Sequence, residues 1–424
     1  MYSLSIEDDD LPKKRKTFFR SNSFKSGVLI KANRLTTLEV TLHRQEVEED
    51  DTNDDDDEHD ADPIDPEALD ICTEPNVYVG GGIPGVAVDE FTIELPKYTG
   101  QTPGGLFSLS KGLWWGSRTR AGNDSMGRRK ENQDSFIIHD KFAGYEELTF
   151  ICVMDGHGSQ GAFVSHFVRD NYPKHVADAC QRYLGSEFLQ STFLTLEMVE
   201  DIFLEASCRM TTQLEEESGL DISVSGSTAV ALLVLTPTHA HPDLSPHLFI
   251  GNVGDSRAVA GIYDASSPNL YKSHVLSVDH KPDVPTELSR ILDTNGRVFE
   301  WGVPRVWLKD VDMPGLAMSR SFGDSVATSV GVISDPAVTE LALPVDKETN
   351  MSSFVVIASD GLWEFLPSDQ VVELCTKCIA EHQDPQTTCD MLVAEALERW
   401  LDEEDVVDDI TVNVLFFPTK LGKV

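Results

Sequence analysis

The sequence predicts an α+β fold in which antiparallel sheets are covered by helices, preceded by an N-terminal extension of different composition. From about residue 112 onward, short apolar runs with the spacing of strands are mixed with segments of helical periodicity. The strand-like runs come partly in pairs rather than in strict alternation with helices, which disfavours a doubly wound parallel sheet. With 424 residues, 40% of them hydrophobic and 25% charged, the chain can bury one large core.

The predicted strands are short runs rich in β-branched and aromatic residues, bounded by turn residues. They span 135–138, 148–154, 228–235, 248–253, 258–263, 354–358 and 410–416. The predicted helices show apolar residues at helical spacing, and Pro, Gly or Asn mark several of their ends. They span 161–171, where Pro173 is expected to end the helix, 197–217, 285–295, 369–382 and 386–403.

The extension, 1–112, is predicted to be largely disordered, ahead of a core predicted at 113–420. It is basic at 12–16, which reads Pro-Lys-Lys-Arg-Lys, and acidic at 46–60, where eleven of fifteen residues are Asp or Glu. Such an acidic run buries too little apolar surface to offset the entropy of ordering. It is either a solvated tail, which is favoured, or an inhibitory segment that folds back over the core. The basic pentamer is a weak match to a nuclear import signal.

Charge and cysteine content limit the partners and the compartment. With 34 basic and 72 acidic residues the chain carries a net charge of −38, which disfavours nucleic-acid and anionic-membrane binding. Its longest apolar run, 229–235, is far shorter than the roughly 20 residues that cross a bilayer, so we expect no membrane span. Seven scattered cysteines, with one Cys-x-x-Cys at Cys375 and Cys378, favour reduced thiols in the cytoplasm or nucleus over disulfides or zinc.

Five aspartates lie at the ends of the predicted strands. Asp155, Asp255 and Asp360 each follow an apolar run, whereas Asp134 and Asp408 precede one. If these strand ends converge, the carboxylates repel one another and require a cation between them. All-oxygen ligands suit Mg²⁺ or Mn²⁺ better than zinc. Any single Asp is more simply a turn or cap residue, but that explanation weakens when all of them occupy equivalent places.

Two further residues beside this set are suited to a phosphoryl ester. His157 follows Asp155 and Gly156 directly, and the flanking glycines allow close approach of a metal or ligand. Its imidazole can protonate a leaving oxygen. Arg129 precedes Asp134 by five residues and offers a bidentate donor to phosphate oxygens. Alone, each would more often be a capping or surface residue, but beside the carboxylates a functional role is favoured.

Eight short motifs follow one another along the core. They are Glu-Asn-Gln-Asp-Ser-Phe (131–136), Val-Met-Asp-Gly-His-Gly (153–158), Ser-Gly-Ser-Thr-Ala (225–229), Gly-Asn-Val-Gly-Asp-Ser-Arg-Ala (251–258), Asp-His-Lys-Pro (279–282), Leu-Ala-Met-Ser-Arg-Ser-Phe-Gly-Asp (316–324), Ala-Ser-Asp-Gly-Leu-Trp-Glu (358–364) and Asp-Asp-Ile-Thr-Val (408–412). In content and order this series resembles the metal-dependent serine/threonine protein phosphatases, the PPM or type 2C family, over roughly residues 113–418.

The resemblance implies a fold of two packed antiparallel β-sheets, a β-sandwich flanked by helices on both sides, with the metal site at one end. It implies a protein phosphatase that hydrolyses phosphoserine and phosphothreonine esters by attack of a water bridging two metal ions. The implied cofactors are two Mg²⁺ or Mn²⁺ ions with a weaker third. The implied site residues are Asp134, Asp155, Asp360, Asp408 and the carbonyl of Gly156 for the two ions, Asp255 for the third, Arg129 for the substrate phosphate and His157 as general acid.

Three positions depart from the family pattern without removing a ligand. Gln133 stands where many members have Glu, Asp409 replaces the usual Asn, and Glu364 replaces a frequent Asp. We therefore expect an active enzyme. The competing prediction is a catalytically weak or inactive protein on the same fold that acts as a regulatory binding module. A metal nuclease is disfavoured by the net charge of −38.

The segment 297–314 corresponds to a variable flap near the active site of the family. Its two tryptophans, Trp301 and Trp307, either contact a phosphopeptide or pack as core beneath the flap, and the sequence favours neither alternative. The partners implied are phosphorylated proteins, with no direct nucleic-acid contact, and we expect a monomer.

Overall fold

The structure is a computed structural model that describes residues 77–81, 107–108, 113–184, 194–237, 245–264, 271–344, 353–381 and 384–417. The chain divides into two units, Met1–Ala68 and Leu69–Val424, and every described residue belongs to the second. The acidic run, the basic pentamer and most of the predicted extension lie outside the described residues. Disorder of the extension and both hypotheses about its role stay predictions.

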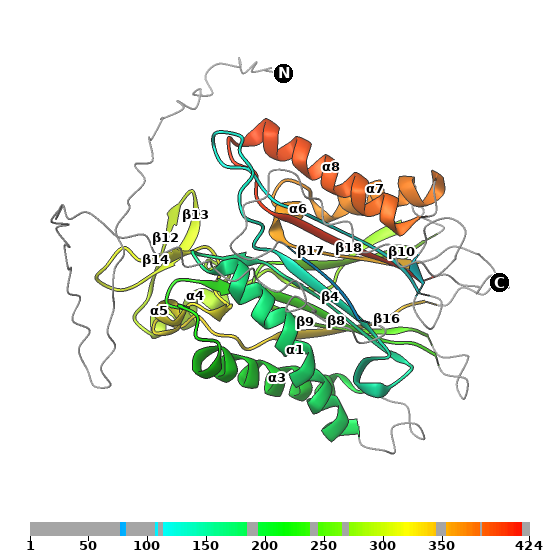
Figure 1. Ribbon diagram of the computed structural model, residues 1–424, viewed down its shortest axis with the longest axis horizontal. Helices are drawn as coiled ribbons and strands as arrows, with labels where there is room; N and C mark the ends of the chain where they lie inside the picture. Colours follow the sequence, from blue (N-terminus) through cyan, green and yellow to red (C-terminus); the bar gives the residue numbers. More distant parts are fainter. Residues whose placement is uncertain are drawn as a thin grey trace, which may run out of the picture. The chain divides into compact units, whose positions relative to one another are not determined.

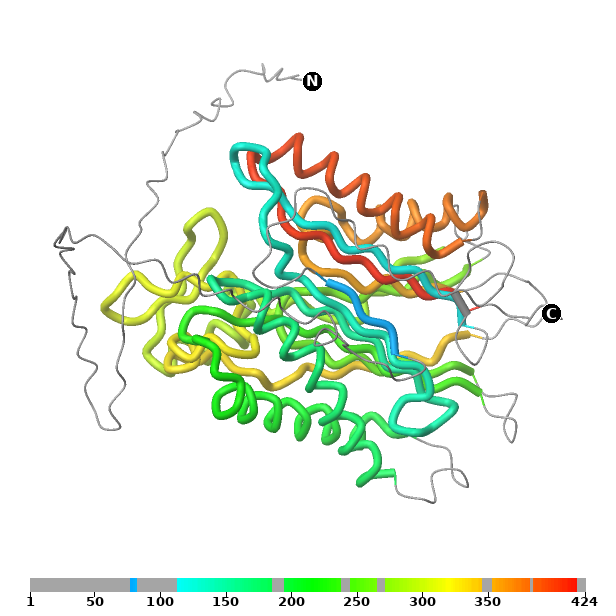
Figure 2. The backbone as a smooth tube through the Cα atoms, viewed as in Figure 1, coloured from blue at the N-terminus to red at the C-terminus, as the bar shows by residue number. Residues whose placement is uncertain are grey.

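Two six-stranded antiparallel sheets form the centre of this unit (Figures 1 and 2). Sheet A has the order β1-β4-β5-β8-β9-β16 and sheet B the order β11-β10-β17-β18-β3-β2, and all neighbours run antiparallel. The strands of sheet A are β1 Val77–Gly81, β4 Ser135–Asp140, β5 Leu148–Met154, β8 Ala229–Leu235, β9 His247–Val253 and β16 Ala337–Ala342. Those of sheet B are β2 Phe107–Ser108, β3 Trp114–Arg120, β10 Arg257–Tyr263, β11 Tyr271–Val275, β17 Ser353–Ala358 and β18 Ile410–Phe417.

Helices cover the outer face of each sheet (Figure 1). The helices α1 Gly161–Leu184 and α3 Leu196–Glu217 pack on sheet A, and α7 Ser368–Glu381 and α8 Pro385–Glu403 pack on sheet B. Shorter helices are η2 Phe142–Gly144, α4 Pro285–Asp293, α5 Ser325–Thr328 and α6 Asp360–Trp363. Two three-stranded sheets are formed by β6 Gly156–His157, β7 Gly226–Ser227 and β15 Phe322–Gly323, and by β12 Arg297–Trp301, β13 Val303–Trp307 and β14 Pro314–Leu316. The predicted antiparallel α+β sandwich with helices on both sides is confirmed.

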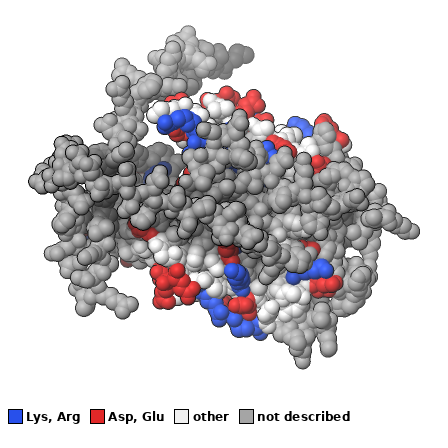
Figure 3. All heavy atoms as spheres, viewed as in Figure 1, with Lys and Arg blue, Asp and Glu red and all other residues white. Residues whose placement is uncertain are grey.

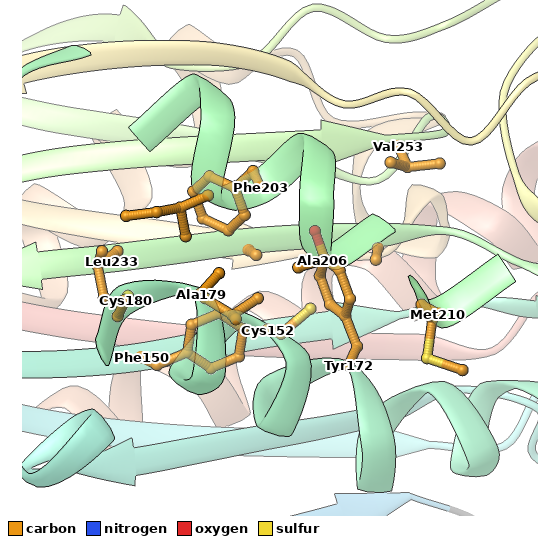
Figure 4. Packing of buried hydrophobic residues seen from close by; sticks show 14 of the residues in the cluster. Phe150, Cys152, Tyr172, Ala179, Cys180, Phe203, Ala206, Met210, Leu233 and Val253 are labelled. Atoms are coloured by element: carbon orange, nitrogen blue, oxygen red, sulfur yellow. The ribbon is translucent and has the colours of Figure 1, made fainter. Parts of the chain in front are cut away.

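Apolar cores hold these layers together. The core between the sheets draws fully buried residues from both, such as Ile138 and Ile151 from sheet A and Val355 from sheet B. A second core joins sheet A to its helices, and Figure 4 shows Tyr172 of α1 and Phe203 of α3 among the side chains packed there. Each such side chain contributes about 1.5–3 kcal/mol on burial. The sandwich is therefore a rigid platform for the loops at its ends.

The helix predicted to end before Pro173 continues through that proline to Leu184. A proline inside a helix removes one backbone hydrogen bond and costs about 3 kcal/mol. The flanking Tyr172, Val176 and Ala179 are fully buried against sheet A. This boundary was wrong because tertiary packing of the second half of α1 outweighs the local signal of the proline.

The described part of the chain includes the Cys-x-x-Cys motif and a surface of mixed charge. Cys375 and Cys378 are buried free thiols on α7, and burial raises the pKa of Cys375. On the face shown in Figure 3, the described Lys and Arg side chains lie among Asp and Glu. No helix in the described part of the chain combines the length and apolar character that a bilayer crossing requires.

The strand β1 lies before the predicted core boundary at residue 113, yet it forms the edge of sheet A beside β4. Gly80 pairs with Phe136, and a Cβ on Gly80 would lie only 2.3 Å from the ring of Phe136. Tyr78 packs against Trp115 with ring centroids 5.0 Å apart. Because β4 directly follows Asp134, β1 covers the strand that carries a predicted metal ligand.

The flap strands β12, β13 and β14 carry a ladder of stacked aromatic rings. Phe299 and Trp307 stack with centroids 4.7 Å apart, and Trp301 stacks on Trp307 at 5.7 Å. Trp307 is 5% exposed and belongs to the packed side of the ladder, whereas Trp301 is 66% exposed. Each of the two alternatives for the flap tryptophans therefore describes one of them: Trp307 is core and Trp301 is available to a partner.

The two ends of the flap are tied together by the buried carboxylate of Glu287 in α4. It accepts hydrogen bonds from Arg290 in the same helix and from Ser319 and Arg320 after the flap, at 2.5, 2.7 and 2.7 Å. Burial raises the pKa of Glu287, but these donors outweigh burial and hold the pKa well below its usual range. The base of the flap is thus held by buried ion pairs.

We expect Gly80→Ala to lower the midpoint of thermal unfolding, because the added methyl must displace the buried ring of Phe136. Overpacking of this kind costs about 1–3 kcal/mol. Phe136→Leu vacates part of the same space, so the double variant should lose less stability than the sum of the two single losses in chemical denaturation. Strict additivity of the two losses would contradict the contact.

Glu287→Gln should lower the free energy of unfolding by about 3 kcal/mol near neutral pH, because two arginines lose their buried counter-charge. Since the folded-state pKa lies below the unfolded value of about 4.3, the stabilisation is complete above that value and is lost as the pH falls. Urea denaturation of both proteins at about pH 7 and at about pH 2 measures the difference. A loss of equal size at both pH values would disprove the ionic role of Glu287.

Candidate metal centre

Strand register in sheet A brings Asp134 and Asp155 to the same end of the sandwich. The strands β4 and β5 pair so that Ser135 lies opposite Met154. Asp134 directly precedes Ser135, and Asp155 directly follows Met154. Because the strands are antiparallel, the beginning of one and the end of the other meet, and both carboxylates lie there.

The remaining three aspartates meet at an end of sheet B for the same reason. The strand β17 ends where β18 and β10 begin. Asp360 lies just after β17, and Asp408 and Asp255 lie two residues before β18 and β10. The predicted convergence of strand ends is thus a property of the antiparallel pairing.

A cleft of about 570 Å³ opens over this end of the sandwich. Asp155, Asp255, Asp360 and Asp408 all line it, together with residues of β13 in the flap and of the C-terminal end of α8. Asp134 does not appear among the described lining residues, because its side chain is completely buried behind them. The cleft therefore combines an acidic floor with walls from the flap and from α8.

Burial and mutual repulsion raise the pKa values of these carboxyl groups. Burial raises the pKa of Asp155 well above its usual range, and four neighbouring charges raise it further, those of Asp134, Asp360, Asp408 and Asp255. The pKa of Asp360 is raised to about 7, mainly by burial and then by the charges of Asp255 and Asp408. The aspartates of both sheets are therefore within electrostatic reach of one another, and a cation would relieve their repulsion.

Two carboxylate oxygens at this site are buried and have no hydrogen-bond partner among the described residues: Asp134 Oδ1 and Asp255 Oδ1. The second oxygen of Asp134 accepts a hydrogen bond from Ser359 Oγ at 2.7 Å. Buried anionic oxygens without a donor are costly, and they are the ligands that Mg²⁺ and Mn²⁺ prefer. The donor set fits such an ion, although no three His, Cys, Asp or Glu side chains in the described ranges form a preformed cage.

Two lysine ammonium groups contact the carboxylates. Lys130 Nζ lies 2.5 Å from Asp408 Oδ1, and Lys281 Nζ lies 2.5 Å from Asp255 Oδ2. Burial lowers the pKa of Lys130, but the charges of Asp409 and Asp408 outweigh burial and raise it overall. The sequence analysis missed both lysines, although Lys281 belongs to the Asp-His-Lys-Pro motif. They balance part of the negative charge of the site.

Asp409, which replaces the usual Asn of the type 2C pattern, is a buried acceptor for two backbone N–H groups. Its Oδ1 accepts from Gly122 N at 2.6 Å and its Oδ2 accepts from Gln133 N at 2.9 Å. An asparagine offers only one acceptor atom there, because its amide nitrogen is a donor. The additional carboxylate therefore fastens the loop 121–133 to the start of β18, an effect that the sequence alone did not predict.

His157 is oriented by a carboxylate that the sequence analysis did not single out. Its Nε2 lies 2.6 Å from Asp324 Oδ2, which also accepts from Ser321 Oγ at 2.6 Å. Burial lowers the pKa of His157, but the charge of Asp324 outweighs burial and raises it. His157 Nδ1 has no partner among the described residues. The neighbouring Gly156 must be glycine, because a Cβ would lie 2.3 Å from the carbonyl oxygen of Gly161.

Arg129 lies in the loop 121–133 and forms an antiparallel bridge with Asn123. It is not among the described residues that line the cleft, so its contact with phosphate stays a prediction. Gln133 and Glu364, the two other departures from the family pattern, do line the cleft. Gln133 Nε2 donates to the carbonyl oxygen of Gly158 at 2.7 Å, which ties it to the glycine-rich turn after β5.

Comparison with known proteins agrees with this geometry. The sequence model of the family described as Protein phosphatase 2C matches residues 119–403. The chain belongs to the protein phosphatase 2C family. "Probable protein phosphatase 2C 64" of Oryza sativa subsp. japonica is 34% identical over 328 residues, which cover 76% of this chain and 70% of the relative. "Probable protein phosphatase 2C 52" of Arabidopsis thaliana is also 34% identical, over 70% of this chain and 64% of its own length.

A solved structure supports the same fold for this type 2C chain. The crystal structure of a serine-threonine phosphatase 2C from Toxoplasma gondii superposes with a TM-score of 0.59. It is 24% identical and covers 74% of this chain and 96% of its own. The predicted family and sandwich are therefore confirmed, while the individual site residues stay predictions that the geometry of the described residues supports.

Asp409→Ala should lower the free energy of unfolding by about 2 kcal/mol or more, because the amides of Gly122 and Gln133 lose their acceptor. Asp409→Asn retains one acceptor and should lose roughly half as much. The exposed Asp405→Ala removes the same charge close by in sequence and serves as the matched control in urea denaturation. Equal stabilities of Asp409→Ala and Asp405→Ala would contradict a stabilising role for the two hydrogen bonds that Asp409 accepts.

Proposed function

We propose that this type 2C protein is a metal-dependent serine/threonine phosphatase that hydrolyses phosphoserine and phosphothreonine esters in proteins. One observation carries the proposal: four aspartates from two sheets line one cleft with Asp134 buried beside them, and two carboxylate oxygens of this set lack a partner among the described residues. Membership of the protein phosphatase 2C family supports the same reaction class.

The residues that would hold two ions are Asp134, Asp155, Asp360, Asp408 and the carbonyl of Gly156, with Asp255 at a third. Mg²⁺ or Mn²⁺, when bound, would supply Lewis acidity toward water and toward the phosphoryl oxygens. The protein's own part is to hold the carboxylates in place. Strand register brings them together, Ser359 orients Asp134, and Lys130 and Lys281 compensate charge on Asp408 and Asp255.

His157 would supply the proton to the leaving serine or threonine oxygen. The hydrogen bond to Asp324 fixes the orientation of the ring and engages Nε2, which leaves Nδ1 as the nitrogen without a partner among the described residues. Arg129 would bind the phosphate as a bidentate donor. The flap would contact the substrate protein beside the cleft, where β13 contributes Val303 and Arg305 to the lining.

The proposal extends to the substrates, the oligomeric state and the cellular location of the enzyme. We propose phosphorylated proteins as substrates, because a cleft open to the flap admits a chain segment rather than only a small ester. The monomeric state and the cytoplasmic or nuclear location remain predictions of the sequence, drawn from its charge and its scattered cysteines.

The test is hydrolysis of a phosphothreonine peptide by the full chain with Mn²⁺, with chelator, and with the variant Asp155→Ala. We expect chelator to abolish turnover and Asp155→Ala to reduce kcat at least about a hundredfold, because the central ligand is removed. The exposed Asp402→Ala serves as the charge-matched control and should retain activity. Turnover that survives both treatments would refute metal dependence. Absent turnover with manganese bound would favour the regulatory binding module.

A further inference from the structure

Lys130 compensates negative charge at this site, but the proposed chemistry gives its ammonium no direct part. Its ammonium lies 2.5 Å from Asp408 Oδ1 and 3.8 Å from Asp409 Oδ2. Asp408 is one of the residues that would hold the metal ions. A lysine on a metal ligand is a cost to metal binding, because two cations then draw on one carboxylate.

The lysine is built into the loop rather than resting on the surface. Its backbone N donates to the carbonyl oxygen of Gly122 at 3.1 Å, and its side chain is 34% exposed. A Cβ on Gly122 would lie 2.5 Å from Lys130 Cε, so the glycine leaves the space that the lysine stem occupies. The N–H of the same Gly122 donates a hydrogen bond to Asp409 Oδ1.

The charge of Asp409 explains why the ammonium stays there. Asp408 is 44% exposed, whereas Asp409 is 4% exposed, so Asp409 places a buried negative charge beside the ligand. In this chain the two carboxylates and the ammonium form one compact group at the start of β18. A divalent ion at Asp408 would share this carboxylate with the Lys130 ammonium.

We propose that the Lys130 ammonium is a built-in competitor of the divalent cation at Asp408, so that Lys130 sets the concentration of Mg²⁺ or Mn²⁺ that the site requires. The inference rests on the proposed metal-dependent function. Its direction is specific: loss of the positive charge tightens metal binding. If Lys130 instead positions Asp408 as a ligand, its loss weakens metal binding.

Calorimetric titration of the chelator-treated full chain with MnCl₂ measures this direction without any turnover. Lys130→Met keeps the length of the stem and removes the charge, and we expect its dissociation constant to fall about tenfold. Lys130→Arg keeps the charge and should stay within about threefold of the unaltered protein. Lys377→Met is the matched control, because Lys377 pairs with Glu373 on the outer helix α7.

A second measurement needs no variant at Lys130. Acylation of lysine amines, followed by peptide mass analysis, reports how available each ammonium is with and without manganese. We expect modification of Lys130 to rise several-fold when manganese is added, because the ion displaces the ammonium from Asp408, while Lys377 stays unchanged. This measurement decides the question alone if Lys130→Met does not fold.

The outcomes separate this inference from the proposed function. An unchanged or weaker manganese affinity of Lys130→Met, or unchanged acylation of Lys130, overturns the competitor role. Failure of the unaltered protein to bind manganese overturns both this inference and the metal dependence. Tighter binding by Lys130→Met in a protein that shows no turnover supports the inference and refutes the phosphatase activity.

Discussion

Repulsion among buried carboxylates is the constraint on which the rest of this site depends. Antiparallel pairing within each sheet forces the aspartates to one end of the sandwich, and burial then makes their charges costly. Several neighbouring groups compensate part of that cost. Ser359 donates to Asp134, Lys130 and Lys281 contribute positive charge, and the oxygens that remain unpartnered among the described residues suit a hard cation.

The parts of the fold that the sequence could predict are those in which local pattern and tertiary packing agree. Buried strands such as β5 and β8 are continuous apolar runs, and the aspartates at strand ends were recognised because their neighbours are so regular. The end of α1 was mispredicted because the proline signal is local while the packing of Val176 and Ala179 is not. The ordered motifs identified the family, and the strand pairing shows how the aspartates in these motifs come together.

The compensating residues could not be predicted because their partners are distant in the chain. Lys130 and Asp408 are 278 positions apart, and His157 and Asp324 are 167 apart. Composition and periodicity say nothing of such pairs. Asp409 is a further example: the sequence identifies it only as a departure from the family pattern, whereas its carboxylate accepts hydrogen bonds from two backbone amides that no spacing argument connects.

The flap is anchored at its base by Glu287, although its tip is exposed. Glu287 binds groups on both sides of the flap, so the base of the flap is held by buried charge while the exposed end of its aromatic ladder projects Trp301. The anchored base and the exposed tip therefore lie at opposite ends of the same short segment. Recognition can change at the tip without disturbing the residues that surround the cleft.

The edge strand β1 limits where the chain can be cut without exposing sheet A. Proteolytic shortening that stops ahead of Val77 leaves sheet A with its border, whereas a cut a few residues later uncovers the ring of Phe136 and a row of unpaired backbone groups on β4. Such a fragment would tend to associate through that open border. Residues that composition assigns to the extension thus include the edge strand that covers Phe136 and the backbone of β4.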